Sequence, residues 1–355
     1  AGLGTAIISI AKGRGMSRSG IDELEPLLTA RDFRAAAQRL LPPATWAYLE
    51  GGAGEERTLR ANQYAFEQWQ LLPRVLAQPE AIDPSTLVLG RTCALPLMIA
   101  PMAHQRLFHD DAERALALAA RATQVTMSIS AQSSCTWEEI SEIHGPGSWL
   151  QLLPDGRAAE WRHVIDRAVS MRCTALMLTV DAAPHGSRYR EQRAGFLPPT
   201  SPSCGTTRMQ WEDLRQLCRE SELPIILKGI LALDDARRAQ DCGAGGVVVS
   251  NHGGRVLDGV PSALSRLPLV RAALGEEMLV MFDSGIRDGS DVIKAIALGA
   301  DLVMLGRPLL HGLAVAGAVG AGRVLQLVIR ELILTMALLG VCLLYTSDAA
   351  DEEDS

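Results

Sequence analysis

Eight short apolar runs, each followed by a longer amphipathic or polar stretch, dominate the sequence from residue 95 to residue 307. The runs are LPLMIA (95–100), VTMSIS (125–130), SWLQLL (148–153), ALMLTV (175–180), PIILKG (224–229), GVVVSN (246–251), LVMFDS (279–284) and LVMLGR (302–307). Continuously apolar strands that alternate with helices are typical of a parallel sheet covered by those helices. Eight such units predict an α/β fold, a (β/α)8 TIM barrel. A doubly wound open sheet is the alternative, disfavoured because no GxGxxG motif follows the first strand.

Three segments are expected along the chain. Residues 1–20 form a disordered N-terminal extension, residues 21–340 a single barrel domain that begins with a helical segment (21–94), and residues 341–355 an atypical disordered tail. The N-terminal stretch carries its charges after its apolar run, so it does not fit a signal peptide. The apolar stretch 324–345 has Arg330 and Glu331 in its middle, which favours a buried helix over a membrane span.

The composition excludes several classes of function. The chain has 355 residues and a formal net charge of −7, which predicts no basic face for nucleic acid. Its seven cysteines are scattered without a CxxC pair. Reduced thiols in a cytoplasmic protein are therefore expected, with no metal site and no membrane partner.

Polar residues stand where the predicted strands end. They are Ser130, Gln151, Thr179, Asp181, Lys228, Ser250, His252, Asp283 and Arg307. In a barrel the loops after the strands meet at one face, and active sites lie there. Any one of these residues alone is typical of a helix cap or turn. The whole ring of hydrogen-bonding groups predicts a flat polar ligand across the barrel mouth.

Two glycine-containing stretches predict that this ligand carries a phosphate. DSGIRDGSD (283–291) follows the seventh strand and GRP (306–308) follows the eighth. Glycines let backbone N–H groups approach an anion, and Arg287 and Arg307 add charged donors. Phosphate sites after strands seven and eight recur in barrels. With Lys228, the pattern indicates a phosphorylated cofactor with a polar ring.

The motifs SNHGGR (250–255), DSGIRDG (283–289) and GRP (306–308) resemble those of the FMN-dependent α-hydroxy acid oxidases and dehydrogenases. The resemblance runs from about residue 40 to residue 339. It implies that the barrel domain binds FMN, that His252 is the catalytic base and that Tyr48, Arg188 and Arg255 bind the substrate. The FMN contacts that it implies are Pro101, Met102, Ala103, Ser130, Gln151, Thr179, Lys228, Ser250, Asp283, Ser284, Gly285, Ile286, Arg287, Gly306 and Arg307.

The resemblance implies oxidation of an (S)-2-hydroxy acid to the 2-oxo acid, with O2 as the electron acceptor, by a homo-oligomer, a tetramer. His252 is suited to take a proton near neutral pH, and Arg255 can hold a carboxylate. Three other functions stay open: a dehydrogenase with a quinone or protein acceptor, a catalytically impaired FMN-binding homologue, and another phosphate-binding barrel such as an isomerase.

The sequence departs from the family pattern at several positions. Leu153 stands where the family usually has Tyr, Val256 where Gln is common, and Ser284 where a second glycine follows the aspartate. The fourth loop has Ser187-Arg188 in place of an Arg pair. Gln132 replaces a Trp of glycolate oxidase, so the pocket is expected to admit a bulky C2 substituent and to prefer a mandelate-like acid to glycolate.

Overall fold

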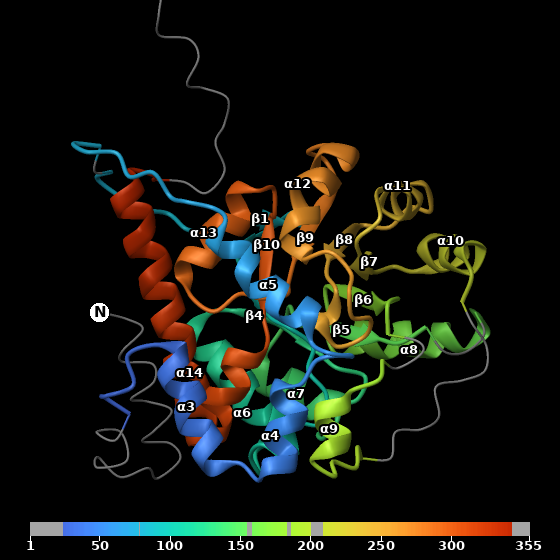
Figure 1. Ribbon diagram of the computed structural model, residues 1–355. Helices are drawn as coiled ribbons and strands as arrows, with labels where there is room; N and C mark the ends of the chain where they lie inside the picture. Colours follow the sequence, from blue (N-terminus) through green and yellow to red (C-terminus); the bar gives the residue numbers. More distant parts are fainter. Residues whose placement is uncertain (1–23, 78, 155–157, 183–185, 200–208, 343–355) are drawn as a thin grey trace, which may run out of the picture.

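The computed structural model describes residues 24–77, 79–154, 158–182, 186–199 and 209–342 (Figure 1). The predicted N-terminal extension (1–20) and nearly all of the predicted tail (341–355) lie outside these residues. So do residues 183–185 and 200–208 of the long loop after the fourth barrel strand.

A closed barrel of eight parallel strands forms the centre of the described chain. Its strands are β3 (Leu97–Ile99), β4 (Thr126–Ile129), β5 (Trp149–Leu152), β6 (Ala175–Thr179), β7 (Ile225–Ile230), β8 (Gly246–Val249), β9 (Leu279–Phe282) and β10 (Leu302–Leu305). The barrel closes where β10 pairs in parallel with β3, with Val303 opposite Leu97. Seven of these strands lie within the predicted apolar runs, and β7 extends one residue past its run, to Ile230. The prediction of a TIM barrel is confirmed, and the open-sheet alternative is wrong.

Helices cover the outside of the barrel in the order expected from the sequence. They are α6 (Ala112–Thr123), α7 (Trp137–His144), α8 (Ala158–Ser170), α9 (Tyr189–Arg193), α10 (Trp211–Glu220), α11 (Leu233–Asp241), α12 (Ala263–Leu274), α13 (Gly289–Ala297) and α14 (Arg307–Leu339). Local signals explain several of their starts: Thr136 forms a capping box with Glu139, and the Asp288 side chain accepts from the Asp291 amide. These caps satisfy amides that a helix N-terminus leaves without partners.

Among the described residues, the helix α14 is long and apolar enough to cross a membrane. However, 72% of its most apolar stretch is buried inside the fold. Its backbone leaves helical geometry at Ala316 and Gly317, so two helical stretches meet there. It packs along α6 and α3 (Ala30–Leu40) at one side of the barrel (Figure 1). The buried-helix prediction for this apolar stretch therefore agrees with its packing.

The segment before the barrel contains helices and one element that the sequence analysis missed. The helices α3, α4 (Pro43–Glu50) and α5 (Arg57–Glu67) are followed by an antiparallel hairpin of β1 (Thr86–Val88) and β2 (Arg91–Cys93). Val88 packs against the side chains inside the barrel. In Figure 1 the hairpin lies at the end of the barrel opposite to α4 and α9.

Candidate active site

A cavity of about 680 Å³ opens at the carboxyl ends of the barrel strands, and it brings together nearly all the predicted site residues. Those that line it are Tyr48, Pro101, Met102, Ala103, Ser130, Gln151, Thr179, Arg188, Lys228, His252, Arg255, Asp283, Ser284, Gly285, Ile286, Arg287, Gly306 and Arg307. Ser250 is the exception: it is fully buried and lies outside this lining. The cavity is of the size at which proteins bind cofactors and small substrates.

His252 stands in a turn that immediately follows β8. Its φ is 57°, and the next two residues, Gly253 and Gly254, have φ of 62° and 74°. Histidine is among the few non-glycine residues that are enriched in this left-handed region, and such conformations gather at functional sites. The turn directs the imidazole into the cavity instead of along the strand.

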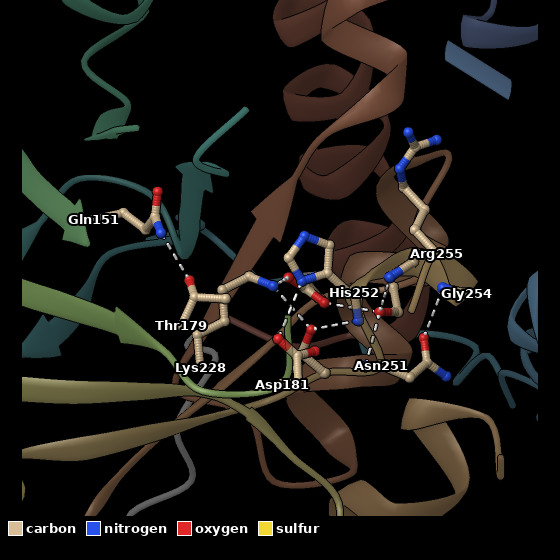
Figure 2. Close-up of polar contacts among 12 residues, drawn as sticks. Gln151, Thr179, Asp181, Lys228, Asn251, His252, Gly254 and Arg255 are labelled. Atoms are coloured by element: carbon tan, nitrogen blue, oxygen red, sulfur yellow. Dashed lines mark hydrogen bonds and ion pairs between the residues drawn. The ribbon is translucent and has the colours of Figure 1, made fainter. Parts of the chain in front are cut away.

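The imidazole is held by a carboxylate from a different strand. His252 Nδ1 lies 3.1 Å from Asp181 Oδ1 (Figure 2). Although burial pushes the pKa of Asp181 up, the charges of His252 and Lys228 lower it overall, so Asp181 is a carboxylate. A carboxylate only accepts hydrogen bonds, so Nδ1 carries the proton and Nε2 is left as the acceptor.

A close approach of two strands makes this contact possible. The register between β7 and β8 shifts between Lys228 and Ile230, with Gly229 at the irregular position. Gly229 has a φ of 111°, and a Cβ there would lie 2.4 Å from Cγ of Asp181. A larger residue would displace Asp181, so the glycine is needed for the pair of Asp181 and His252.

Lys228 forms a buried ion pair with Asp283. Its Nζ lies 3.1 Å from Asp283 Oδ2 and donates to Ser250 Oγ at 3.1 Å. Burial disfavours the charged ammonium, but the charges of Asp283 and Asp181 raise the pKa of Lys228 above its usual value. Burial and this neighbouring ammonium lower the pKa of His252. His252 is therefore neutral at neutral pH and ready to accept a proton.

Hydrogen-bonding side chains of β4, β5 and β6 form a connected row on the opposite wall. Gln151 Nε2 donates to Thr179 Oγ1 at 3.0 Å (Figure 2), and Ser130 Oγ donates to Gln151 Oε1 at 3.3 Å. Such a row fixes the direction of each donor and acceptor. It matches the prediction of a flat polar ligand across the barrel mouth.

The two predicted substrate-binding arginines share a carboxylate that the sequence analysis missed. Arg255 Nη2 donates to Glu191 Oε1 at 3.0 Å, and Arg188 Nη1 lies 3.5 Å from the same oxygen. Arg255 Nη1 also donates to the backbone oxygens of Tyr48 and Gly51, both at 2.7 Å. Its guanidinium extends away from the cluster around His252 (Figure 2). These contacts leave part of its donor set for a ligand.

Arg307 and Arg287 form a positive region in the wall of the cavity. Arg307 donates to the backbone oxygens of Leu49 at 3.0 Å and Gly253 at 3.1 Å. Burial, followed by the positive charges of Arg255 and Arg287, lowers the pKa of Arg307 to about 9. Glu50 and Glu56 favour the charged guanidinium but do not outweigh these effects, so a bound anion would stabilise the charge further. A phosphate fits this donor set.

An aromatic cluster also lines the cavity. Tyr48 stacks on Phe196 with ring centroids 4.5 Å apart and on Phe108 at 6.2 Å. Both phenylalanines line the cavity but were not predicted; their apolar character alone gave no signal that separates them from core residues. Glu191 carried a weak signal, since it lies one helical turn after Arg188.

Comparison with known proteins identifies the family. The model of the family described as FMN-dependent dehydrogenase matches residues 37–207 and 202–349. The chain belongs to this family of FMN-dependent α-hydroxy acid oxidases and dehydrogenases. It is an oxidoreductase that acts on CH–OH donors, with FMN as its cofactor. The predicted recognition, fold and cofactor are thereby confirmed.

Relatives within the FMN-dependent family cover almost the whole chain. An L-lactate oxidase of Alicycliphilus denitrificans is 38% identical, covering 90% of this chain and 94% of the relative. A 4-hydroxymandelate oxidase of Amycolatopsis orientalis is 39% identical, covering 87% and 93%. The solved structure of a mandelate oxidase has a TM-score of 0.84 and 38% identity, and the match covers 89% of this chain and 96% of that one.

The residues around the cavity fit FMN. The arginines Arg287 and Arg307 would hold its phosphate, because both line the cavity and a bound anion would stabilise their buried charges. Lys228 would donate hydrogen bonds to its polar ring, and the row of Ser130, Gln151 and Thr179 could both donate to the ring and accept from it, since all four residues line the cavity.

Proposed function

We propose that this protein oxidises (S)-2-hydroxy acids to 2-oxo acids, with O2 as the final electron acceptor. Bound FMN supplies the two-electron acceptor for the substrate. The observation that carries the proposal is the neutral imidazole of His252, oriented by Asp181 at 3.1 Å and placed in the same cavity as two arginines. A base beside a carboxylate-binding group is what removal of a proton and two electrons from a 2-hydroxy acid requires.

His252 acts as the general base in this proposal. Its Nε2 accepts a proton from the substrate, and the imidazolium that forms is stabilised by Asp181 on the other side of the ring. Lys228 keeps a positive charge at the base of the cavity, where negative charge arises during the reaction. The ion pair with Asp283 holds that ammonium in place.

Arg188, Arg255 and the Tyr48 hydroxyl bind the substrate carboxylate in this proposal. The three residues line one part of the cavity, and the Arg255 guanidinium lies 4.9 Å from the Tyr48 ring centroid. Glu191 fixes both arginines, so the carboxylate meets donors whose positions are already set. Such pre-organisation lowers the entropic cost of placing the reacting carbon.

The preferred substrate is a 2-hydroxy acid with a bulky, mandelate-like substituent. Gln132 and Leu153 line the cavity at positions where larger aromatic groups stand in glycolate oxidase. Relatives named 4-hydroxymandelate oxidase and L-lactate oxidase support a 2-hydroxy acid substrate. The names of these relatives also favour O2 over a quinone as the acceptor.

We further propose that the enzyme is a cytoplasmic homotetramer. The described cysteines are free thiols, which suits a reducing compartment. Leu72, Val75 and Leu76 are each more than four-fifths exposed, and a subunit contact would cover them. Sedimentation analysis of the purified protein tests the tetramer: a monomer at micromolar concentration contradicts it.

An oxygen electrode combined with a peroxide assay tests the proposed reaction. The purified, FMN-loaded enzyme is mixed in air with (S)-mandelate, (S)-lactate and glycolate. We expect O2 uptake, H2O2 and the 2-oxo acid in equal amounts. Turnover with an artificial quinone but not with O2 would indicate a dehydrogenase, and bound FMN without any turnover would indicate an impaired homologue.

A further inference from the structure

The hydroxyl of Ser284 joins the turn that carries His252 to the buried ion pair. Ser284 Oγ donates to Asp283 Oδ1 at 2.8 Å and accepts from the Gly253 amide at 3.0 Å. It also lies 3.4 Å from the amide nitrogen of Asn251. A hydroxyl has one donor and two acceptor sites, so these contacts use all of them.

Ser284 makes these contacts from a strained backbone. Its φ is 86°, in the left-handed region where glycine is favoured. A side chain at such a position persists only when the surrounding structure holds it. The three contacts of Oγ provide that restraint, and glycine, which would be free of strain here, would lack all of them.

A second serine holds the neighbouring amide of the same turn. Ser250 Oγ accepts from the His252 amide at 3.0 Å and from Lys228 Nζ at 3.1 Å. The successive amides of His252 and Gly253 are therefore each bound by a serine hydroxyl, and each hydroxyl also contacts one member of the Lys228–Asp283 pair. Since the turn is too irregular for backbone pairing of these two amides, side chains must supply their partners.

We propose that Ser284 is a positioning residue that sets the place of the His252 imidazole through the Gly253 amide. The inference rests on the proposed function, in which His252 is the base. Without the hydroxyl, the Gly253 N–H loses its partner and the left-handed turn is free to move. Small displacements of a catalytic base lower the reaction rate, because proton transfer requires the donor and the acceptor to be close and aligned.

Two substitutions separate the hydroxyl from the backbone strain. Ser284→Ala removes the hydroxyl and keeps the strain, whereas Ser284→Gly removes the hydroxyl and relieves the strain. We expect both variants to lower the limiting rate of flavin reduction by about 10-fold, with little change in the substrate dissociation constant. Ser284→Gly should unfold at a higher temperature than Ser284→Ala, because only the glycine relieves the backbone strain. The rate of flavin reduction would then depend on the hydroxyl, and the unfolding temperature on the strain.

Ser141→Ala is the matched control. Ser141 is also a buried serine, and it lies on α7, away from the cavity. Its hydroxyl donates to the Met171 backbone oxygen at 2.8 Å. This variant should lower the unfolding temperature while it leaves the limiting rate unchanged. A loss of rate as large as that in the Ser284 variants would show that any lost buried hydrogen bond slows the enzyme, and would overturn the proposal.

Hydrogen–deuterium exchange of the segment 250–256 gives a readout that does not depend on activity. We expect faster exchange in both Ser284 variants than in the parent, and no change in Ser141→Ala. Parent-like exchange and parent-like reduction rates would overturn the role of Ser284. If the parent enzyme itself is not reduced by any 2-hydroxy acid, the proposed function fails, and the exchange data alone decide whether Ser284 holds the turn.

Discussion

Asp181 Oδ1 lies 3.1 Å from His252 Nδ1, although the two residues follow different strands, β6 and β8, that are not neighbours in the barrel. Burial, followed by the charge of Lys228 on the intervening strand β7, lowers the pKa of His252. The pKa of Asp181 is lowered, against the effect of burial, by His252 and then by Lys228. The contact sets the tautomer of the imidazole. The protonation state and orientation of the proposed base therefore depend on residues from three strands, β6, β7 and β8.

Asp181→Asn should slow flavin reduction by about 10²-fold, because the imidazolium loses its carboxylate partner. It should also change the pH dependence. The pKa of His252 lies below its ordinary value of 6.5, and Asp181 is one of the groups that raise it. The base must be deprotonated, so kcat/KM should rise with pH through a midpoint that lies below 6.5 in the parent and at still lower pH in the variant. An unchanged profile in Asp181→Asn would contradict this role.

Arg307→Ala should weaken FMN binding by about 10- to 150-fold, since a charged hydrogen bond contributes about 1.5–3 kcal/mol. Fluorescence titration of the apoprotein with FMN measures the dissociation constant. Arg219→Ala, at an exposed position on α10, is the control and should bind FMN as the parent does. Equal affinities in all three proteins would remove Arg307 from the phosphate site.

(S)-Mandelate should have a higher kcat/KM than glycolate, by about 10- to 150-fold, if burial of the aryl ring contributes about 1.5–3 kcal/mol. Gln132→Trp should fill the space for the ring and reduce this preference, mainly by lowering kcat/KM for (S)-mandelate. Steady-state kinetics with both acids and both proteins decide the matter. A parent enzyme that prefers glycolate would show that other residues of the cavity set the pocket.

Stability should fall as the pH rises from about 4 to about 7, through one buried carboxyl. Burial, followed by the charge of Asp288, raises the pKa of Asp291 from 3.8 to about 7. In this range the folded state binds more protons at Asp291 than the unfolded state does, so unfolding becomes easier with increasing pH. Asp291→Asn should flatten this part of the curve of unfolding temperature against pH. A parallel curve in the variant would contradict the assignment.

The barrel could be predicted because its strands are buried on both faces and therefore appear as continuous apolar runs. The hairpin of β1 and β2 could not be predicted in the same way. Its strands have three residues each, and Leu87 is exposed. Only the turn at Leu89 and Gly90, with φ of 50° and 74°, carries a local signal, and its first residue is not one that such turns prefer.

The site could be predicted as a set of residues but not as a network. The polar residues at the strand ends are visible in the sequence, and in a barrel these ends meet at one face. Most of the predicted residues therefore do line the cavity. The contact of Asp181 with His252 depends on the irregular register at Gly229, and no pattern in one sequence reports such a shift. Ser250 shows the same limit: it follows an apolar strand, but its hydroxyl binds the His252 amide and lies outside the cavity lining.

Anaerobic stopped-flow mixing of the FMN-loaded enzyme with (S)-mandelate or (S)-lactate tests the central claim most directly. The visible absorption of the flavin should bleach as an equimolar amount of 2-oxo acid forms. His252→Ala should keep its FMN and bleach about 10²-fold more slowly or worse. A parent enzyme whose flavin stays oxidised with every 2-hydroxy acid would contradict the proposed function. Bleaching of His252→Ala at the parent rate would contradict the role of His252 as the base.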